Sequence, residues 1–110
     1  PYVTSKWAVI GLMKSLAIEL GPYNVNVNAI CPGSVEGDRL EKVIDAEVIS
    51  KGMSRDKIYK AYTEGTSLKK LISPRDIADM AFFLAGQKSK LVSGQVIAVD
   101  GHTEVPDPKF

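Results

Sequence analysis

Two short segments with strand-like sequences constrain the possible folds of this chain most, because segments with helical patterns separate them. Residues 24–30 alternate asparagine with apolar side chains and predict one strand, and residues 95–99 predict a second, buried strand. Parallel strands need a long crossover between them, usually helical. The order helix, strand, two short helices, helix, strand therefore predicts a parallel α/β sheet. Two strands do not make an independent sheet of this class, so we expect a missing N-terminal half.

The first helix is expected over Pro1–Leu20, and Gly21-Pro22 is expected to end it. Apolar residues recur along it at helical spacing and also cover a second side. A helix that is apolar over most of its girth lies in the centre of a larger domain or against a partner subunit.

Tyr2 and Lys6 lie four residues apart at the start of this helix and therefore share one face. The ammonium and the positive end of the helix dipole both favour the phenolate form of a nearby tyrosine. The pair is a candidate acid/base device. The spacing alone fits a surface tyrosine beside a solvated lysine better.

The first strand is expected to end at Cys31-Pro32-Gly33, since proline cannot donate to a ladder and glycine permits a tight loop. In open α/β sheets such strand-end loops form the ligand crevice. The chain then becomes polar and amphipathic up to Leu71. We expect two modest helices here, broken at Lys51-Gly52, with Ser54 capping the second. They suit a substrate lid over about residues 36–71, or an ordinary surface insertion.

A further helix is expected to begin at Ser73-Pro74-Arg75-Asp76, with Ser73 as N-cap, and to stop at Gly86. The tail from His102 to Phe110 is expected to be irregular. We expect residues 1–110 to belong to one domain.

Composition excludes several classes of protein. The chain of 110 residues is 45% hydrophobic and 25% charged, with a formal net charge of +1. This is a globular composition without the strong positive field that recruits nucleic acid or anionic membranes. No apolar run is long enough for a bilayer, and the lone cysteine, Cys31, gives no disulfide and no cysteine cluster for a metal. We therefore expect no nucleic-acid, membrane or metal partner, and a cytoplasmic location.

Four motifs, in this order, resemble the classical short-chain dehydrogenase/reductases. They are Tyr2-Val3-Thr4-Ser5-Lys6, the NAICPGSV segment at 28–35, the SPRDIA segment at 73–78 and the SGQVIAVDG segment at 93–101. The resemblance covers nearly the whole chain and corresponds to the C-terminal part of such an enzyme. It implies a Rossmann-like, doubly wound parallel sheet whose N-terminal half is absent.

The resemblance also implies an activity, namely hydride transfer between NAD or NADP and a secondary alcohol or ketone. By resemblance, Tyr2 is the general acid/base, and Lys6 binds the nicotinamide ribose. The loop Pro32, Gly33, Ser34 and Val35 matches the cofactor-binding loop, with backbone groups of Val35 reaching the carboxamide. The family usually forms homodimers or homotetramers.

Three departures qualify the match. Gly37 replaces a threonine that touches the cofactor in many relatives, and Asp100-Gly101-His102 replaces the commoner Asp-Gly-Gly. The glycine-rich phosphate loop, the residue that selects NAD or NADP and the catalytic serine would precede Pro1. The main alternative is therefore a non-catalytic fragment that acts only in oligomerisation or binding. Epimerases of nucleotide sugars share YxxxK, but the early SGQVIAVDG ending argues against them.

Five other residues have more than one interpretation. Cys31 fits a small, partly buried hydrophobe better than a reactive thiol. His102 lacks the neighbours of a catalytic base. The charged residues Glu36, Asp38 and Arg39 could contact a substrate's polar end, although a solvated loop is the simpler interpretation.

Overall fold

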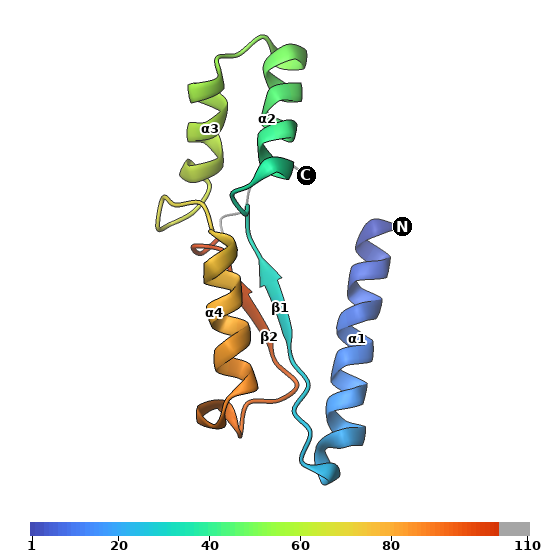
Figure 1. The fold of residues 1–110 in the computed structure, drawn as a ribbon. Helices are drawn as coiled ribbons and strands as arrows, with labels where there is room; N and C mark the ends of the chain where they lie inside the picture. Colours follow the sequence, from blue (N-terminus) through green and yellow to red (C-terminus); the bar gives the residue numbers. More distant parts are fainter. Residues whose placement is uncertain (104–110) are drawn as a thin grey trace. The chain divides into compact units, whose positions relative to one another are not determined.

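The structure, a computed structural model, describes residues 1–103, and the part of the expected irregular tail at 104–110 lies outside the described residues. The elements are α1 (Tyr2–Leu20), the 3-10 turn η1 (Gly21–Tyr23), β1 (Ala29–Pro32), α2 (Asp38–Lys51), α3 (Arg55–Glu64), α4 (Pro74–Ala85), the 3-10 turn η2 (Gln87–Ser89) and β2 (Val96–Val99) (Figure 1). They form two compact units. The first contains residues 1–31 and 78–97, and the second contains 32–77 and the chain from 98 onward.

The two strands pair in parallel, as predicted. The N–H of Ala29 donates to the carbonyl of Gln95 at 2.9 Å. Four residues further along both strands, the N–H of Gly33 donates to the carbonyl of Val99, also at 2.9 Å. Because both partners advance in the same direction, the strands run parallel, and their carboxyl ends lie at one edge.

The predicted start of the first strand was wrong. The alternating segment 24–30 enters the ladder only at Ala29, and β1 then continues to Pro32. The asparagines explain the difference. The side-chain amide of Asn26 donates to two carbonyl oxygens of residues 89 and 90, and that of Asn28 donates to the carbonyl of Val92 at 2.9 Å. Side-chain hydrogen bonds therefore hold residues 26–28 where a strand ladder was expected.

The first helix ends at Leu20, as predicted, but Gly21-Pro22 does not break the helical path of the chain. Gly21 keeps a right-handed helical conformation, so the chain continues through η1. Asn24, with φ 61°, adopts the left-handed conformation that ends the turn. Asparagine tolerates this conformation better than most residues do.

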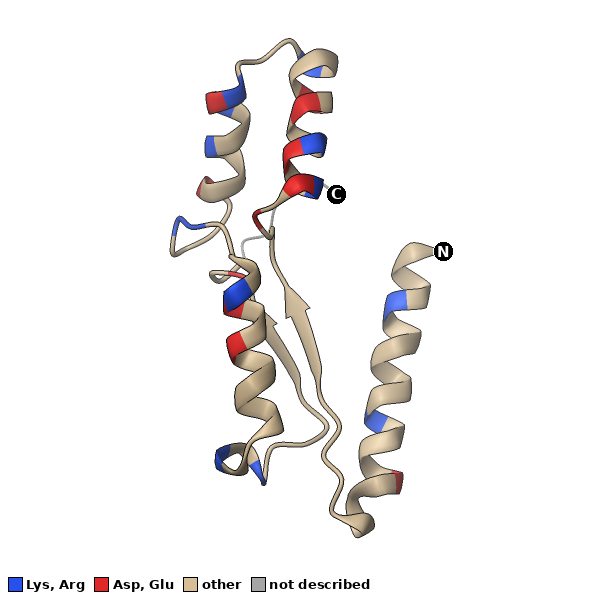
Figure 2. Cartoon of the chain, viewed as in Figure 1, with Lys and Arg blue, Asp and Glu red and all other residues tan. Residues whose placement is uncertain are grey.

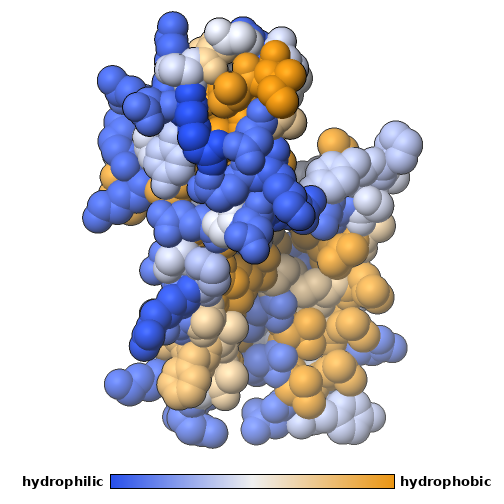
Figure 3. Space-filling view, turned by 45° about the horizontal axis from the view of Figure 1, so that its top comes forward, coloured by the Kyte–Doolittle hydropathy of each residue, from blue (hydrophilic) through white to orange (hydrophobic). Residues whose placement is uncertain are grey.

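Most of the apolar surface of α1 is exposed. Met13 is its one buried residue, whereas Ile18 is 81% exposed. Val3, Trp7 and Leu12 are exposed as well, and Figure 3 shows hydrophobic atoms along this helix. A helix of this kind fits packing against a larger domain or a partner subunit, which remains a prediction.

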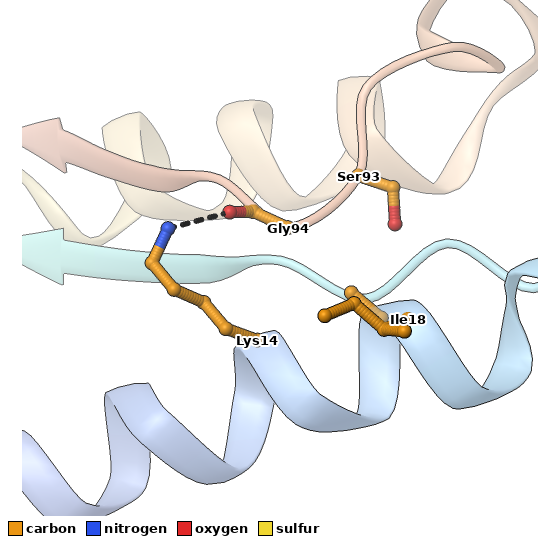
Figure 4. A pocket seen from close by; sticks show the side chains of 5 residues that line it. Lys14, Ile18, Ser93 and Gly94 are labelled. Atoms are coloured by element: carbon orange, nitrogen blue, oxygen red, sulfur yellow. Dashed lines mark hydrogen bonds between the residues drawn. The ribbon is translucent and has the colours of Figure 1, made fainter.

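Lys14 ties α1 to the loop before β2. Its Nζ donates to the carbonyl of Gly94 at 3.0 Å, across an open hollow of about 320 Å³ (Figure 4). A Cβ on Gly94 would lie 3.6 Å from the Ala17 side chain. The lysine stem and Ile18 complete the wall, so the hollow belongs to the packing of α1 on this loop.

The segment expected to be a lid folds as a helical hairpin of α2 and α3, with many charged residues (Figure 2). Ile44 and Ile58, one from each helix, are buried. Arg55 forms ion pairs with two carboxylates of α2, those of Glu41 and Asp45. The lid role stays a prediction.

Tyr62 of α3 adds a hydrogen bond to this hairpin. Its hydroxyl donates to the Glu47 carboxylate at 3.1 Å. Burial, and secondarily this bond and the negative charge of Glu47, raise the pKa of Tyr62. The phenol is therefore a stable donor across the hairpin.

The predicted start of α4 is confirmed. The hydroxyl oxygen of Ser73 accepts from the N–H of Asp76 at 3.2 Å, and the Asp76 carboxylate accepts from the N–H of Ser73 at 2.8 Å. This reciprocal capping box satisfies two donors, with Pro74 as the first helical residue.

Replacing Ser73 by alanine should lower the free energy of unfolding by about 1 kcal/mol, because the Asp76 N–H loses its side-chain acceptor. Denaturant unfolding measures the change. Ser50→Ala, the same substitution inside α2, is the control and should be neutral or slightly stabilising, because alanine favours helix. An equal loss in both variants would contradict the capping role.

The capping box should also make stability depend on pH. The backbone N–H of Ser73, and then its side chain, lower the pKa of Asp76. A carboxyl with a lowered folded-state pKa stabilises the fold above its unfolded pKa of about 3.9 and loses that contribution as pH falls through the folded value. Unfolding of Asp76→Asn should therefore differ from wild type at pH 6, and the difference should shrink below about pH 4. A difference that is constant with pH would refute the ionic contribution.

Candidate functional site

Tyr2 and Lys6 lie in the first two turns of α1, where the helix brings them together. The Lys6 Nζ is 5.4 Å from the centroid of the Tyr2 ring, within the range of a cation–π contact. Tyr2 is 72% exposed. The N–H of Ser5 donates to the carbonyl of Pro1 at 2.9 Å, so the helical hydrogen bonds begin at the residue before the tyrosine.

The geometry of this pair suits proton exchange with a bound molecule. The phenol presents a group that both donates and accepts hydrogen bonds, beside a cation with three donors. Within residues 1–103, Lys6 forms no ion pair with a carboxylate. Its ammonium therefore keeps donors available for hydroxyl groups of a ligand.

The loop at Pro32–Val35 lies in the second unit, at the carboxyl end of β1. Pro32 is the last strand residue. Gly33 is packed so closely against Asp100 that a Cβ on it would lie 2.8 Å from the Cα and the Cβ of Asp100. Only glycine fits this contact without a shift of one of the two segments.

A single parallel bridge holds the rest of this loop. The N–H of Ile72 donates to the carbonyl of Ser34 at 3.0 Å, and the N–H of Glu36 donates to the carbonyl of Ile72 at 2.7 Å. In this pattern the N–H and the C=O of Val35 point away from Ile72. Neither has a hydrogen-bond partner among residues 1–103. Val35 therefore offers a donor and an acceptor side by side, which matches an amide-bearing ligand.

The predicted residues thus form two local groups, Tyr2 with Lys6 in the first unit and Pro32–Val35 in the second. Sequence analysis missed the supports of the loop, Ile72 and Asp100. The close contact of Asp100 with Gly33 depends on strand pairing. The sequence signal for it was the Asp100-Gly101 turn.

The structure adds no support for a reactive cysteine, a metal site or a membrane-spanning helix among residues 1–103. Cys31 is half-buried in β1. Within residues 1–103, histidine, cysteine and carboxylate residues form no group of three or more that suits a metal ion. In the same residues, each helix is too short or too polar to cross a bilayer.

Comparisons with known proteins identify the family of the chain. A sequence model of the family described as enoyl-(acyl carrier protein) reductase matches residues 1–102. The chain is 40% identical over 101 residues to an L-2,3-butanediol dehydrogenase of Corynebacterium glutamicum, covering 91% of this chain and 39% of the relative.

Two solved structures share the fold. A short-chain dehydrogenase family protein from Francisella tularensis superposes with a TM-score of 0.84 at 35% identity, covering 91% of this chain and 41% of that one. L-sorbose reductase from Gluconobacter frateurii, solved with NADPH and L-sorbose, gives a TM-score of 0.84 at 25% identity, covering 94% and 40%.

The chain thus spans about two fifths of the length of the curated relatives that it matches. Its parallel strands and flanking helices correspond to part of the Rossmann-like sheet of those structures. With nearly all of its residues covered by the family match, the chain belongs to the short-chain dehydrogenase/reductase family.

Proposed function

We propose that the protein carrying this chain is an NAD(P)-dependent oxidoreductase that transfers hydride between NAD or NADP and a secondary alcohol or ketone. One observation carries the proposal: the exposed Tyr2 hydroxyl beside the Lys6 ammonium, in the sequence context of this family. The relatives support the substrate class, because one is named for a diol and another was solved with NADPH and a sugar.

In this proposal Tyr2 donates a proton to the carbonyl oxygen during reduction and accepts one from the hydroxyl during oxidation. Lys6 binds hydroxyl groups of the cofactor's ribose through its ammonium donors. The bound nicotinamide supplies the hydride chemistry. The protein's own task is to orient the two reactants and to move the proton.

The loop residues fit a nicotinamide cofactor. The unpaired N–H and C=O of Val35 match the acceptor and the donor of a carboxamide. Within this loop Pro32 has no N–H to donate, the N–H of Gly33 donates to Val99, and the carbonyl of Ser34 accepts from Ile72. We infer that this loop binds the nicotinamide end of the cofactor.

We also propose a homodimer or homotetramer in the cytoplasm. The exposed apolar side chains of α1 support association, since a contiguous apolar surface marks an interface more often than a free surface. The same observation favours the alternative, in which the chain acts only in oligomerisation or binding.

Replacing Tyr2 by phenylalanine in the complete protein tests the catalytic role. Turnover of a secondary alcohol, followed by nicotinamide absorbance, should fall by about 10² to 10⁴-fold, because the proton carrier is lost. NAD(P)H should still bind in a fluorescence titration. Tyr23→Phe, at another exposed tyrosine of the same unit, should leave turnover unchanged.

Two outcomes would count against the proposal. Retained turnover in Tyr2→Phe would refute the role of the tyrosine. Absence of NAD(P)H binding and turnover in the wild-type protein would favour the non-catalytic alternative.

Replacing Gly33 by alanine tests the cofactor loop. The new Cβ would lie 2.8 Å from Asp100 backbone, so the loop must shift. We expect the Kd for NAD(P)H to rise by about tenfold or more, since overpacking costs about 1–3 kcal/mol. Gly11→Ala, where no atom lies within 4 Å of the new Cβ, is the matched control and should leave the Kd unchanged. Wild-type affinity in Gly33→Ala would show that the loop does not contact the cofactor.

A further inference from the structure

The turn after β2 packs on the candidate cofactor loop. Gly33 donates its N–H to Val99 and lies against Asp100, as described above. The carboxylate of Asp100 accepts from the N–H of His102 at 2.8 Å and from the hydroxyl of Thr103 at 2.7 Å. These two bonds close the turn, so the position of Asp100 against Gly33 depends on the residues that follow it.

The same turn is attached on another side to the loop after α3. The N–H groups of Ser67 and Leu68 donate to the carbonyls of His102 and Gly101, at 2.9 and 3.1 Å. The imidazole Nδ1 of His102 lies 2.9 Å from the hydroxyl oxygen of Ser67. This side-chain bond and the two backbone bonds form one contact, which we call the His102 latch.

His102 occupies a conformation that favours glycine. Its φ is 68°, in the left-handed region that few residues other than glycine adopt, although asparagine, aspartate and histidine adopt it more often than the rest. Backbone strain of this kind persists only where surrounding contacts determine the conformation. The latch supplies such contacts, since both the backbone and the ring of His102 are engaged.

We propose that His102 is a positioning residue for cofactor binding: its bond to Ser67 fixes the Asp100 turn, which in turn holds Gly33 and the loop to Val35 in place. The inference rests on the proposed function, because the affected ligand is the nicotinamide cofactor. It assigns a role to a residue that departs from the family's commoner Asp-Gly-Gly ending.

A different role for the Ser67–His102 pair, as a nucleophile and its base, is disfavoured by the surrounding donors. The N–H of Leu68 donates to Gly101, and the N–H of Lys69 donates to the carbonyl of Thr66. These neighbouring groups are therefore not available to stabilise an oxyanion.

The test removes the side-chain bond of the latch from either side in the complete protein. Ser67→Ala deletes the hydroxyl, and His102→Gly deletes the ring while keeping a residue that accepts the same φ. Each should raise the Kd for NAD(P)H by about two- to tenfold, as expected for one lost hydrogen bond, with kcat at saturating cofactor nearly unchanged. The double variant should bind NAD(P)H no more weakly than the weaker-binding single variant, because both substitutions remove the same Ser67–His102 bond.

A second measurement needs no cofactor. The Gly33 amide should exchange with solvent faster in both variants than in wild type, because its packing partner Asp100 is less fixed. His102→Asn should retain wild-type behaviour in both measurements, because asparagine tolerates the left-handed conformation and its amide can reach Ser67. Asn24→Gly, which also replaces a left-handed residue by glycine, is the control and should change neither.

Unchanged Kd and unchanged Gly33 exchange in Ser67→Ala and His102→Gly would overturn the proposal, even if the melting temperature falls. Failure of the proposed function is a separate result: the wild-type protein would then bind no NAD(P)H. In that case the exchange of the Gly33 amide still decides whether the latch positions the loop.

Discussion

The parallel pairing of β1 with β2 is the interaction on which the candidate cofactor loop depends. The bond from the Gly33 N–H to the Val99 carbonyl fixes the register at the end of both strands. Since parallel strands end at the same edge of a sheet, the loop after β1 and the turn after β2 become neighbours. The close contact of Gly33 with Asp100 follows from this register, as does the need for glycine.

The helices could be predicted because their signals are local. Ser73 and Asp76 cap α4 across a single turn, and Ser54 and Gly52 bracket the break between α2 and α3 as expected. The first strand could not be located so well. Its start depends on hydrogen bonds from Asn26 and Asn28 to residues far away in the sequence, and alternation alone does not distinguish such contacts from a ladder.

The candidate site shows the same division. Tyr2 and Lys6 could be paired from their spacing, because residues four apart on a helix share a face. The N–H and C=O of Val35, which have no partner among residues 1–103, could not be predicted from spacing. They result from the bridge to Ile72, which joins the two ends of the α2–α3 segment. The left-handed conformation of His102 could not be predicted either, since the sequence shows only that a histidine replaces the commoner glycine.

The two groups of residues also differ in how strictly they require particular side chains. In the proposed function Tyr2 and Lys6 act through their side chains, so the chemistry would be lost when either residue changes. The loop would act through its backbone, so in the proposed function the side chains of Ser34 and Val35 matter less than the path of the chain that carries them. That path is set by strand register, by one bridge and by a contact that excludes a Cβ. Tolerance to substitution should therefore be narrow at Gly33 and broader at the next two positions, although all three belong to one binding loop.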